Sequence, residues 1–86
     1  MSVRPIAVTI SFVSGLGALA ETDEASIELS DGSTVASLID ALRGRFPVLF
    51  PAAERAVYLV NARRAAPDTV LSDGDRVLVL QILGGG

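Results

Sequence analysis

The sequence predicts an α+β fold in which one main helix lies on one face of a mixed sheet of four to five strands. Apolar and polar residues alternate near both ends of the chain, as in strands, whereas the apolar spacing between residues 35 and 46 is helical. These elements follow one another in the order strand, strand, helix, strand, strand, without a linker or repeat. We therefore expect the helix to cover one face, the last strand to lie beside the first, and the other face to stay open.

Two strands are expected in the first third of the chain. In residues 6–12 large apolar side chains occupy every second position, which places them on one face of an extended segment. Residues 26–30 alternate in the same way, and an Asp-Gly pair at 31–32 then supplies a turn. The apolar positions of the two strands are Ile6, Val8, Ile10, Phe12, Ile27 and Leu29.

The main helix is expected over about residues 35–43. Its apolar residues fall on one stripe, because their spacing follows the helical period. Ser33 or Thr34 can cap the first turn by accepting a backbone N–H, and Gly44 between two arginines suits the carboxyl end. The residues of the stripe are Val35, Leu38, Ile39, Leu42 and Phe46.

Two further strands are expected in the second half. Pro47 and Pro51 argue against regular structure before the β-branched and aromatic run at 56–60, which predicts a third strand. Residues 61–64 and 72–75 have turn composition, and the final strand is expected over residues 76–83. This last strand is apolar on both sides, so either Val77 and Val79 or their neighbours Leu78, Leu80 and Ile82 could face the helix.

Composition excludes several classes of function. The 86 residues are expected to form a single domain over 1–86, with a flexible tail at 84–86. Without cysteine or histidine the chain lacks thiolate metal ligands and the commonest general base, so we expect no metal site and no enzyme acting on its own. A net charge of −3 argues against nucleic acid as a partner, and the apolar runs are too short to cross a membrane. We expect a cytoplasmic protein.

Two motifs are better explained by turns and loops. Residues 15–20 fit the G-x-G-x-x-G/A pattern of dinucleotide-binding loops, but a strand follows within a few residues and no second nucleotide-binding half fits in the chain. We expect a plain flexible loop there. Asp68, Asp73 and Asp75 suggest a calcium loop, yet the further ligands of such a loop are missing. They are interpreted as turn formers.

The carboxyl-terminal glycines Gly84, Gly85 and Gly86 are the strongest functional signal. A floppy end would explain them, but they follow directly on an expected strand. Three residues without a side chain extend about 10 Å and can thread a channel that a Cβ would block. The α-carboxylate at the end is ionised at neutral pH and can attack the α-phosphate of ATP.

The chain resembles the ubiquitin-like (β-grasp) sulfur carriers, most of all the small subunit of molybdopterin synthase. The resemblance rests on residues 71–77 with the glycines, on 31–35 at the entry of the helix, and on the valine-rich strand 57–61. Gly85 and Gly86 take the diglycine positions of the family, whereas the prolines common before them are absent. The long connection 13–25 is more similar to the molybdopterin branch than to the thiamine carriers.

The resemblance implies a mechanism. A ubiquitin-activating-type adenylyltransferase uses ATP to adenylate Gly86, and a sulfur donor forms the thiocarboxylate. Bound to a larger synthase subunit, the thiocarboxylate then delivers its sulfur to a pterin precursor. No cofactor is expected to bind this chain permanently. In this interpretation Gly85 and Gly86 carry the chemistry and Gly84 extends the reach. Partners would contact the tail through Ile82 and Leu83, and the sheet through Leu78 and Leu80.

Three alternatives stay open. A sulfur carrier of another pathway, such as thiamine or cysteine synthesis, would use the same tail. A ubiquitin-like modifier would join the activated tail to amines of other proteins. A β-grasp interaction module would never activate its tail.

Overall fold

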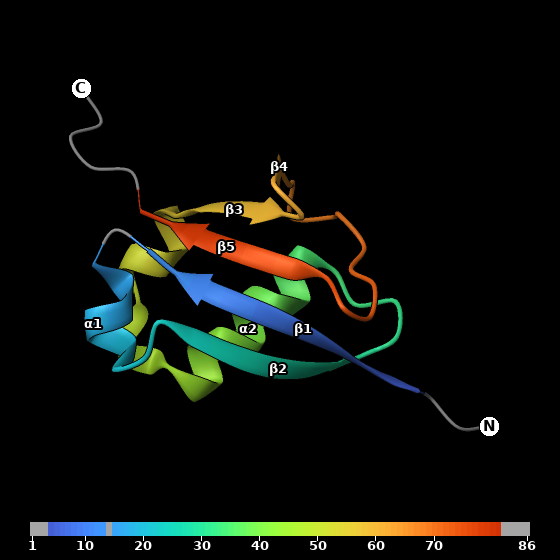
Figure 1. Ribbon diagram of the computed structural model, residues 1–86, viewed down its shortest axis with the longest axis horizontal. Helices are drawn as coiled ribbons and strands as arrows, with labels where there is room; N and C mark the ends of the chain where they lie inside the picture. The colour runs from blue at the N-terminus through green and yellow to red at the C-terminus, as the bar shows by residue number, and fades with distance from the viewer. Residues whose placement is uncertain (1–3, 14, 82–86) are drawn as a thin grey trace.

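A computed structural model describes residues 4–13 and 15–81 and has the expected architecture (Figure 1). The five strands form one mixed sheet in the order β2-β1-β5-β3-β4, and the main helix, α2, lies behind this sheet in the view of Figure 1. The expected fold class is therefore confirmed. The elements are β1 (Pro5–Phe12), α1 (Leu16–Ala20), β2 (Glu24–Ser30), α2 (Val35–Arg45), the 3₁₀ helices η1 (Pro47–Leu49) and η2 (Ala52–Arg55), β3 (Val57–Val60), β4 (Arg63–Arg64) and β5 (Arg76–Leu80).

The last strand lies beside the first, as expected. β1 and β5 run parallel, with Ile10 opposite Val77 and Phe12 opposite Val79. The other pairs, β1 with β2, β3 with β5 and β3 with β4, are antiparallel. β5 is thus enclosed between β1 and β3, and the sequence that follows it starts from the middle of the sheet.

The core lies between α2 and one face of the sheet. The four alternating apolar residues of β1 are all buried there, because a strand turns every second side chain to the same face. Leu38 and Leu42 of α2 cover them and are fully buried. Burying a side chain of this size contributes about 1.5 to 3 kcal/mol relative to leaving it in water. The rings of Phe12 and Phe46 close one end of this layer edge to face, with centroids 5.4 Å apart.

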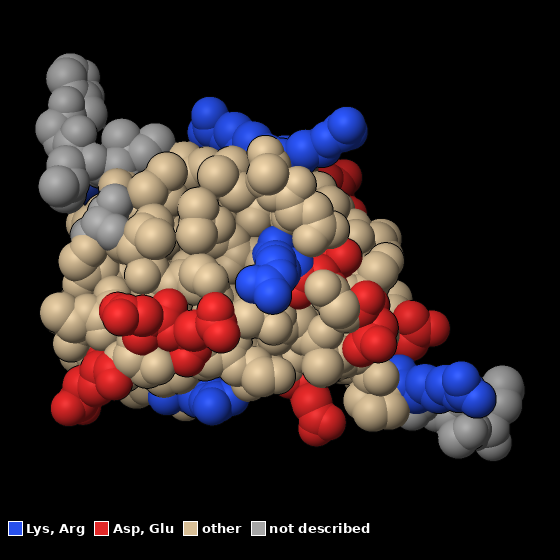
Figure 2. All heavy atoms as spheres, in the orientation of Figure 1, with Lys and Arg blue, Asp and Glu red and all other residues tan. Residues whose placement is uncertain are grey.

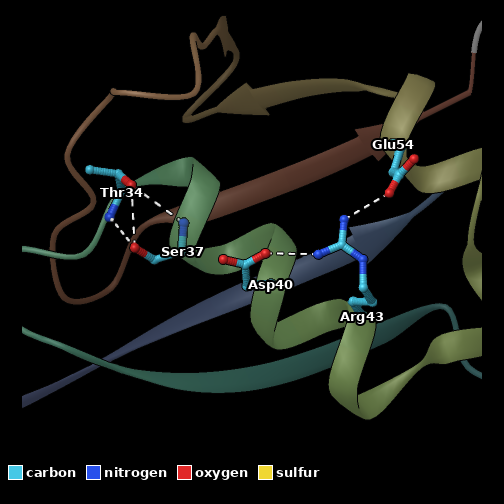
Figure 3. Close-up of polar contacts among 5 residues, drawn as sticks. All are labelled: Thr34, Ser37, Asp40, Arg43 and Glu54. Carbon is cyan, nitrogen blue, oxygen red and sulfur yellow. Dashed lines mark hydrogen bonds and ion pairs between the residues drawn. The ribbon is translucent and has the colours of Figure 1, made fainter.

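α2 begins at Val35, directly after its N-cap Thr34, and ends two residues later than expected. The Thr34 side chain accepts a hydrogen bond from the Ser37 backbone N–H, and the Ser37 hydroxyl accepts one from the Thr34 N–H, both at 3.3 Å (Figure 3). This pair satisfies backbone donors that the first turn leaves free. At the other end Arg45 is still helical and donates to the Ser26 carbonyl at 2.7 Å, so Gly44 lies inside the last turn and does not end the helix.

The segment after α2 is more regular than expected. Pro47 and Pro51 predict no regular structure, but η1 and η2 each form a short 3₁₀ turn that contains a buried side chain, Leu49 and Ala53. A proline suits the first turn of such a helix, since its missing N–H would have no partner there.

Arg43 ties this segment to α2. Its guanidinium donates to Asp40 one turn earlier and to Glu54 of η2, each at 2.8 Å (Figure 3). It also lies 4.9 Å from the centre of the Phe50 ring. Hydrogen bonds to Glu54 and then to Asp40 raise the pKa of Arg43 above its usual value.

The expected loop at residues 15–20 is wrong in one respect, because it contains the short helix α1. Leu16 is fully buried and pins this helix to the core. A Cβ on Gly17 would lie 2.5 Å from Asp23 Oδ1, so this glycine permits the close approach of the turn into β2. The dinucleotide interpretation stays excluded, since β1 and β2 pair antiparallel and do not form the parallel unit that such a site requires.

Two expected boundaries change around the last strands. Asn61 and Ala62 form the expected turn with positive φ, but the next two residues pair with β3 as the short strand β4. β5 ends at Leu80, and Gln81 follows it outside the sheet. Of the stretch expected as strand, 82–83 lies outside the described residues. Across 4–13 and 15–81, none of the helices has both the length and the apolar character needed to cross a membrane.

Candidate functional site

The expected reactive tail begins where the described residues end. Ile82, Leu83, Gly84, Gly85 and Gly86 lie outside them, so their roles stay predictions. The structure does show what precedes the tail. Hydrogen bonds from β1 and β3 hold β5 on both sides, and the Val13 N–H donates to the Val79 carbonyl at 3.1 Å one residue before the strand ends. The tail therefore starts from a fixed central strand.

The structure decides which side of β5 faces the helix. Val77 and Val79 are 1% and 0% exposed and belong to the core under α2. Leu78 and Leu80 alternate with them and are half-buried on the opposite, open face of the sheet. The two residues predicted to contact partners thus lie on the face that α2 leaves free.

On this open face the leucines of β5 join apolar residues of β3. The strand register places Leu59 opposite Leu78 and Val57 opposite Leu80. These four half-buried residues, which we call the apolar strip, lie next to the point where the tail begins. On the other side of Leu78 the register places Ser11 of β1, so the strip is confined to the two strands β3 and β5.

Charged side chains surround this strip unevenly. Figure 2 shows the open face with an uncharged area over β3 and the end of β5, while acidic side chains gather over β2 and near the turn that leads into β5. The acidic residues of β2 itself are Glu24 and Glu28, both exposed. Arg76 at the start of β5 has the phase of Leu78 and Leu80 and is exposed, so a cation stands at the end of the strip farthest from the tail.

The acidic turn before β5 is structural. Asp73 Oδ1 accepts the Ala7 backbone N–H at 2.8 Å, and the Gly74 N–H donates to the Ala7 carbonyl at 2.8 Å. Asp75 accepts hydrogen bonds from Asn61 Nδ2 at 2.9 Å and from the Ser72 N–H at 2.8 Å. The interpretation of these two as turn formers is confirmed. In the part of the chain that the structure describes, no three acidic residues are grouped to hold a metal ion.

Sequence reasoning missed the clamp that fixes Arg76. Asn61 donates its backbone N–H to the Arg76 carbonyl at 2.8 Å, and its Oδ1 accepts the Arg76 N–H at 3.0 Å. An asparagine directly after a strand could have indicated this clamp. Asparagine tolerates the positive φ found here, and its short amide side chain can form hydrogen bonds with nearby backbone groups.

Comparison with known proteins agrees with this architecture. A match to the ThiS family extends over residues 13–86. The chain is 35% identical over 66 residues to the molybdopterin synthase sulfur carrier subunit of Mycobacterium tuberculosis, an alignment that covers 77% of this chain and 80% of that protein.

Solved structures share the fold. Small archaeal modifier protein 1 of Haloferax volcanii superimposes with a TM-score of 0.84 at 19% identity, over 91% of this chain and 99% of that one. A chain in the protein-protein complex of subunits 1 and 2 of the Helicobacter pylori molybdopterin-converting factor matches with a TM-score of 0.68 at 18% identity, over 94% of this chain and all of that one. At these identities the likeness concerns the fold alone. The family match and the sulfur-carrier relative carry the assignment: the chain belongs to the ThiS family.

Proposed function

We propose that this chain is a sulfur carrier of the molybdopterin synthase small-subunit type, whose sulfur is carried on the α-carboxyl group of Gly86. The family match, which runs through residue 86, is the observation that carries this proposal. The 35% identity to a molybdopterin synthase sulfur carrier subunit supports the pathway. The central position of β5 supports the role of the tail, because a rigid strand can direct the residues that follow it into a partner.

The proposed chemistry has two steps. A carboxylate oxygen of Gly86 attacks the α-phosphate of ATP, so that the acyl-adenylate forms and pyrophosphate leaves. Hydrosulfide then attacks the acyl carbon and expels AMP, which leaves a thiocarboxylate and releases a proton. An adenylyltransferase provides the site for both steps, and this chain supplies the carboxyl group and the glycines that let it enter the site.

In this proposal a larger synthase subunit binds the carrier. The similar Helicobacter pylori structure, a complex of subunits 1 and 2 of the molybdopterin-converting factor, supports such an assembly. The apolar strip of this chain also supports such an assembly, because binding becomes more favourable when a partner removes half-buried leucines from water. Catalytic side chains for sulfur transfer would then come from the partner.

Intact-mass analysis tests the proposal directly. The chain is incubated with the adenylyltransferase of its own genome, ATP and sulfide, and the mass is expected to rise by the difference between one sulfur and one oxygen atom. An unchanged mass, under conditions in which an established carrier reacts, would contradict the proposal. Conjugates to amines of other proteins would instead identify a ubiquitin-like modifier.

Two variants separate tail length from tail identity. Deleting Gly86 leaves a chain that still ends in two glycines but is one residue shorter, and we expect it to lose the mass gain. A residue added after Gly86 is expected to do the same. Both variants should unfold at the wild-type temperature, and a large loss of thermal stability would show that the glycines are packed against the body.

A further inference from the structure

The exposed guanidinium of Arg76 stands at one end of the apolar strip. On the open face Thr9 lies opposite on β1, and Leu78 follows two residues later on the same strand. Figure 2 shows a basic side chain over the first part of β5, with an uncharged area on one side and acidic side chains close by on the other. The cation is thus next to an apolar surface and is not part of the acidic group over β2.

The carboxylates nearest in sequence to Arg76 are already engaged. Both oxygens of Asp75 accept hydrogen bonds, from Asn61 and from Ser72, and Asp73 accepts the backbone N–H of Ala7. Within residues 4–13 and 15–81 every ion pair belongs to Arg43, on the far side of the sheet. The backbone of Arg76 is nevertheless fixed, since Asn61 bonds both its N–H and its carbonyl. The guanidinium therefore projects from a fixed backbone position and makes no ion pair within these residues, so it is available to pair with an external anion.

We propose that Arg76 is the orienting contact for the larger synthase subunit, and that this partner places a carboxylate against it at the edge of an apolar docking surface. This inference rests on the proposed function. A guanidinium pairs with a carboxylate through two parallel hydrogen bonds, which fix direction as well as position. The net charge of −3 disfavours a polyanion such as nucleic acid on the same face.

The position of Arg76 explains why one charge suffices. At about 3.3 Å per strand residue, Arg76 lies roughly 13 Å from Leu80, where β5 ends and the tail begins. Apolar contact along the strip has little directional preference and would allow the partner to bind in more than one orientation. A charge pair at the far end removes the reversed orientation, so the tail enters the partner on the correct side.

The decisive variant is Arg76→Glu, with Arg63→Glu as its matched control. Arg63 is also exposed on a strand, but its register partner Val60 has the phase of the core-facing residues, so the control changes the net charge equally and leaves the open face alone. Isothermal titration against the larger synthase subunit of the same genome is expected to show binding weakened about 10- to 100-fold by Arg76→Glu, and by less than about threefold by the control.

Three results would overturn the inference. Equal affinity of the wild type and Arg76→Glu, with a wild type that gains sulfur in the mass assay, rejects the role of Arg76 while the proposed function stands. A wild type that gains no sulfur rejects the proposed function and this inference with it. A wild-type dimer in sedimentation that Arg76→Glu dissociates would show that a second copy occupies this face. Added salt should weaken wild-type binding more than that of Arg76→Gln, because screening acts on the charge pair.

Discussion

The face of the sheet that α2 covers and the face that it leaves open are built from the same strands, yet their residues differ in kind. On the covered face β1, β2, β3 and β5 contribute apolar side chains, and Ile10 and Val79 are 0% exposed. On the open face β1 and β2 carry mainly small or charged residues such as Ser11 and Glu28, whereas β5 and β3 carry leucines. The fold explains the apolar residues of the covered face, which are buried under α2, and the small or charged residues of β1 and β2, which are exposed to water. It does not explain Leu78 and Leu80, which therefore point to a partner.

The largest expected effect comes from placing a charge on the covered face. In Val79→Asp an unpaired carboxylate would be buried, which costs several kcal/mol. At about 0.05 to 0.15 kcal/mol per residue the whole domain is stable by only about 4 to 13 kcal/mol. We expect the variant to be unfolded, or to lose most of its thermal stability, in circular dichroism. A melting temperature within a few degrees of the wild type would show that Val79 is not in the core.

An effect of intermediate size is expected at high pH from Tyr58, which is also on the covered face. Burial raises the pKa of Tyr58 from the usual 10 to about 12. The charge of Arg43 lowers this pKa and the charge of Glu54 raises it, both by less than burial does. Tyr58 ionises at a lower pH in the unfolded chain than in the folded one. Its contribution to the free energy of unfolding is therefore complete below pH 10 and is lost as the pH rises to 12. The loss is about 2 to 3 kcal/mol.

Urea unfolding between pH 9 and pH 12, with absorbance at the tyrosinate band as a second readout, measures this step. The control is Tyr58→Phe, which lacks the hydroxyl that donates to the Ala53 carbonyl at 2.7 Å; it is expected to be about 1 kcal/mol less stable than the wild type below pH 10 and to lack the Tyr58-dependent loss above it. Since the chain has no lysine or cysteine and only one tyrosine, few other groups titrate in this range. The same pH slope in both proteins would show that Tyr58 is not the cause.

The smallest effect on stability is expected from the same charge on the open face. Leu80→Asp loses a cross-strand contact with Val57, worth about 0.2 to 1 kcal/mol, and buries no charge. Its unfolding temperature should stay near the wild-type value while binding to the larger synthase subunit falls at least about tenfold. Ser26→Asp adds a carboxylate to the same face on β2 and should change neither quantity. Full binding by Leu80→Asp would exclude the apolar strip as the docking surface.

The strongly periodic elements could be predicted from the sequence. The strands β1 and β2 and the helix α2 lie within two residues of their expected bounds, because their apolar residues follow the strand or the helix period. The short elements could not. α1, η1, η2 and β4 have two to five residues, too few for a period to show, and tertiary packing forms them by burying residues such as Leu16 and Leu49.

The candidate site divides in the same way. The sequence by itself indicated the glycine tail, because consecutive glycines can be recognised without knowing any tertiary contact. The roles of Gly85 and Gly86 stay predictions, since these residues lie outside the described structure. It could not assign the faces of β5, since valines and leucines alternate there and both kinds are apolar. Only the tertiary structure decided this, because pairing with β1 places Val77 beside Ile10 under α2 and so turns Leu78 and Leu80 outward. The same pairing left Arg76 at the end of the apolar strip, because alternation within β5 shows that Arg76 shares a face with Leu78 and Leu80 but not which face of the sheet that is.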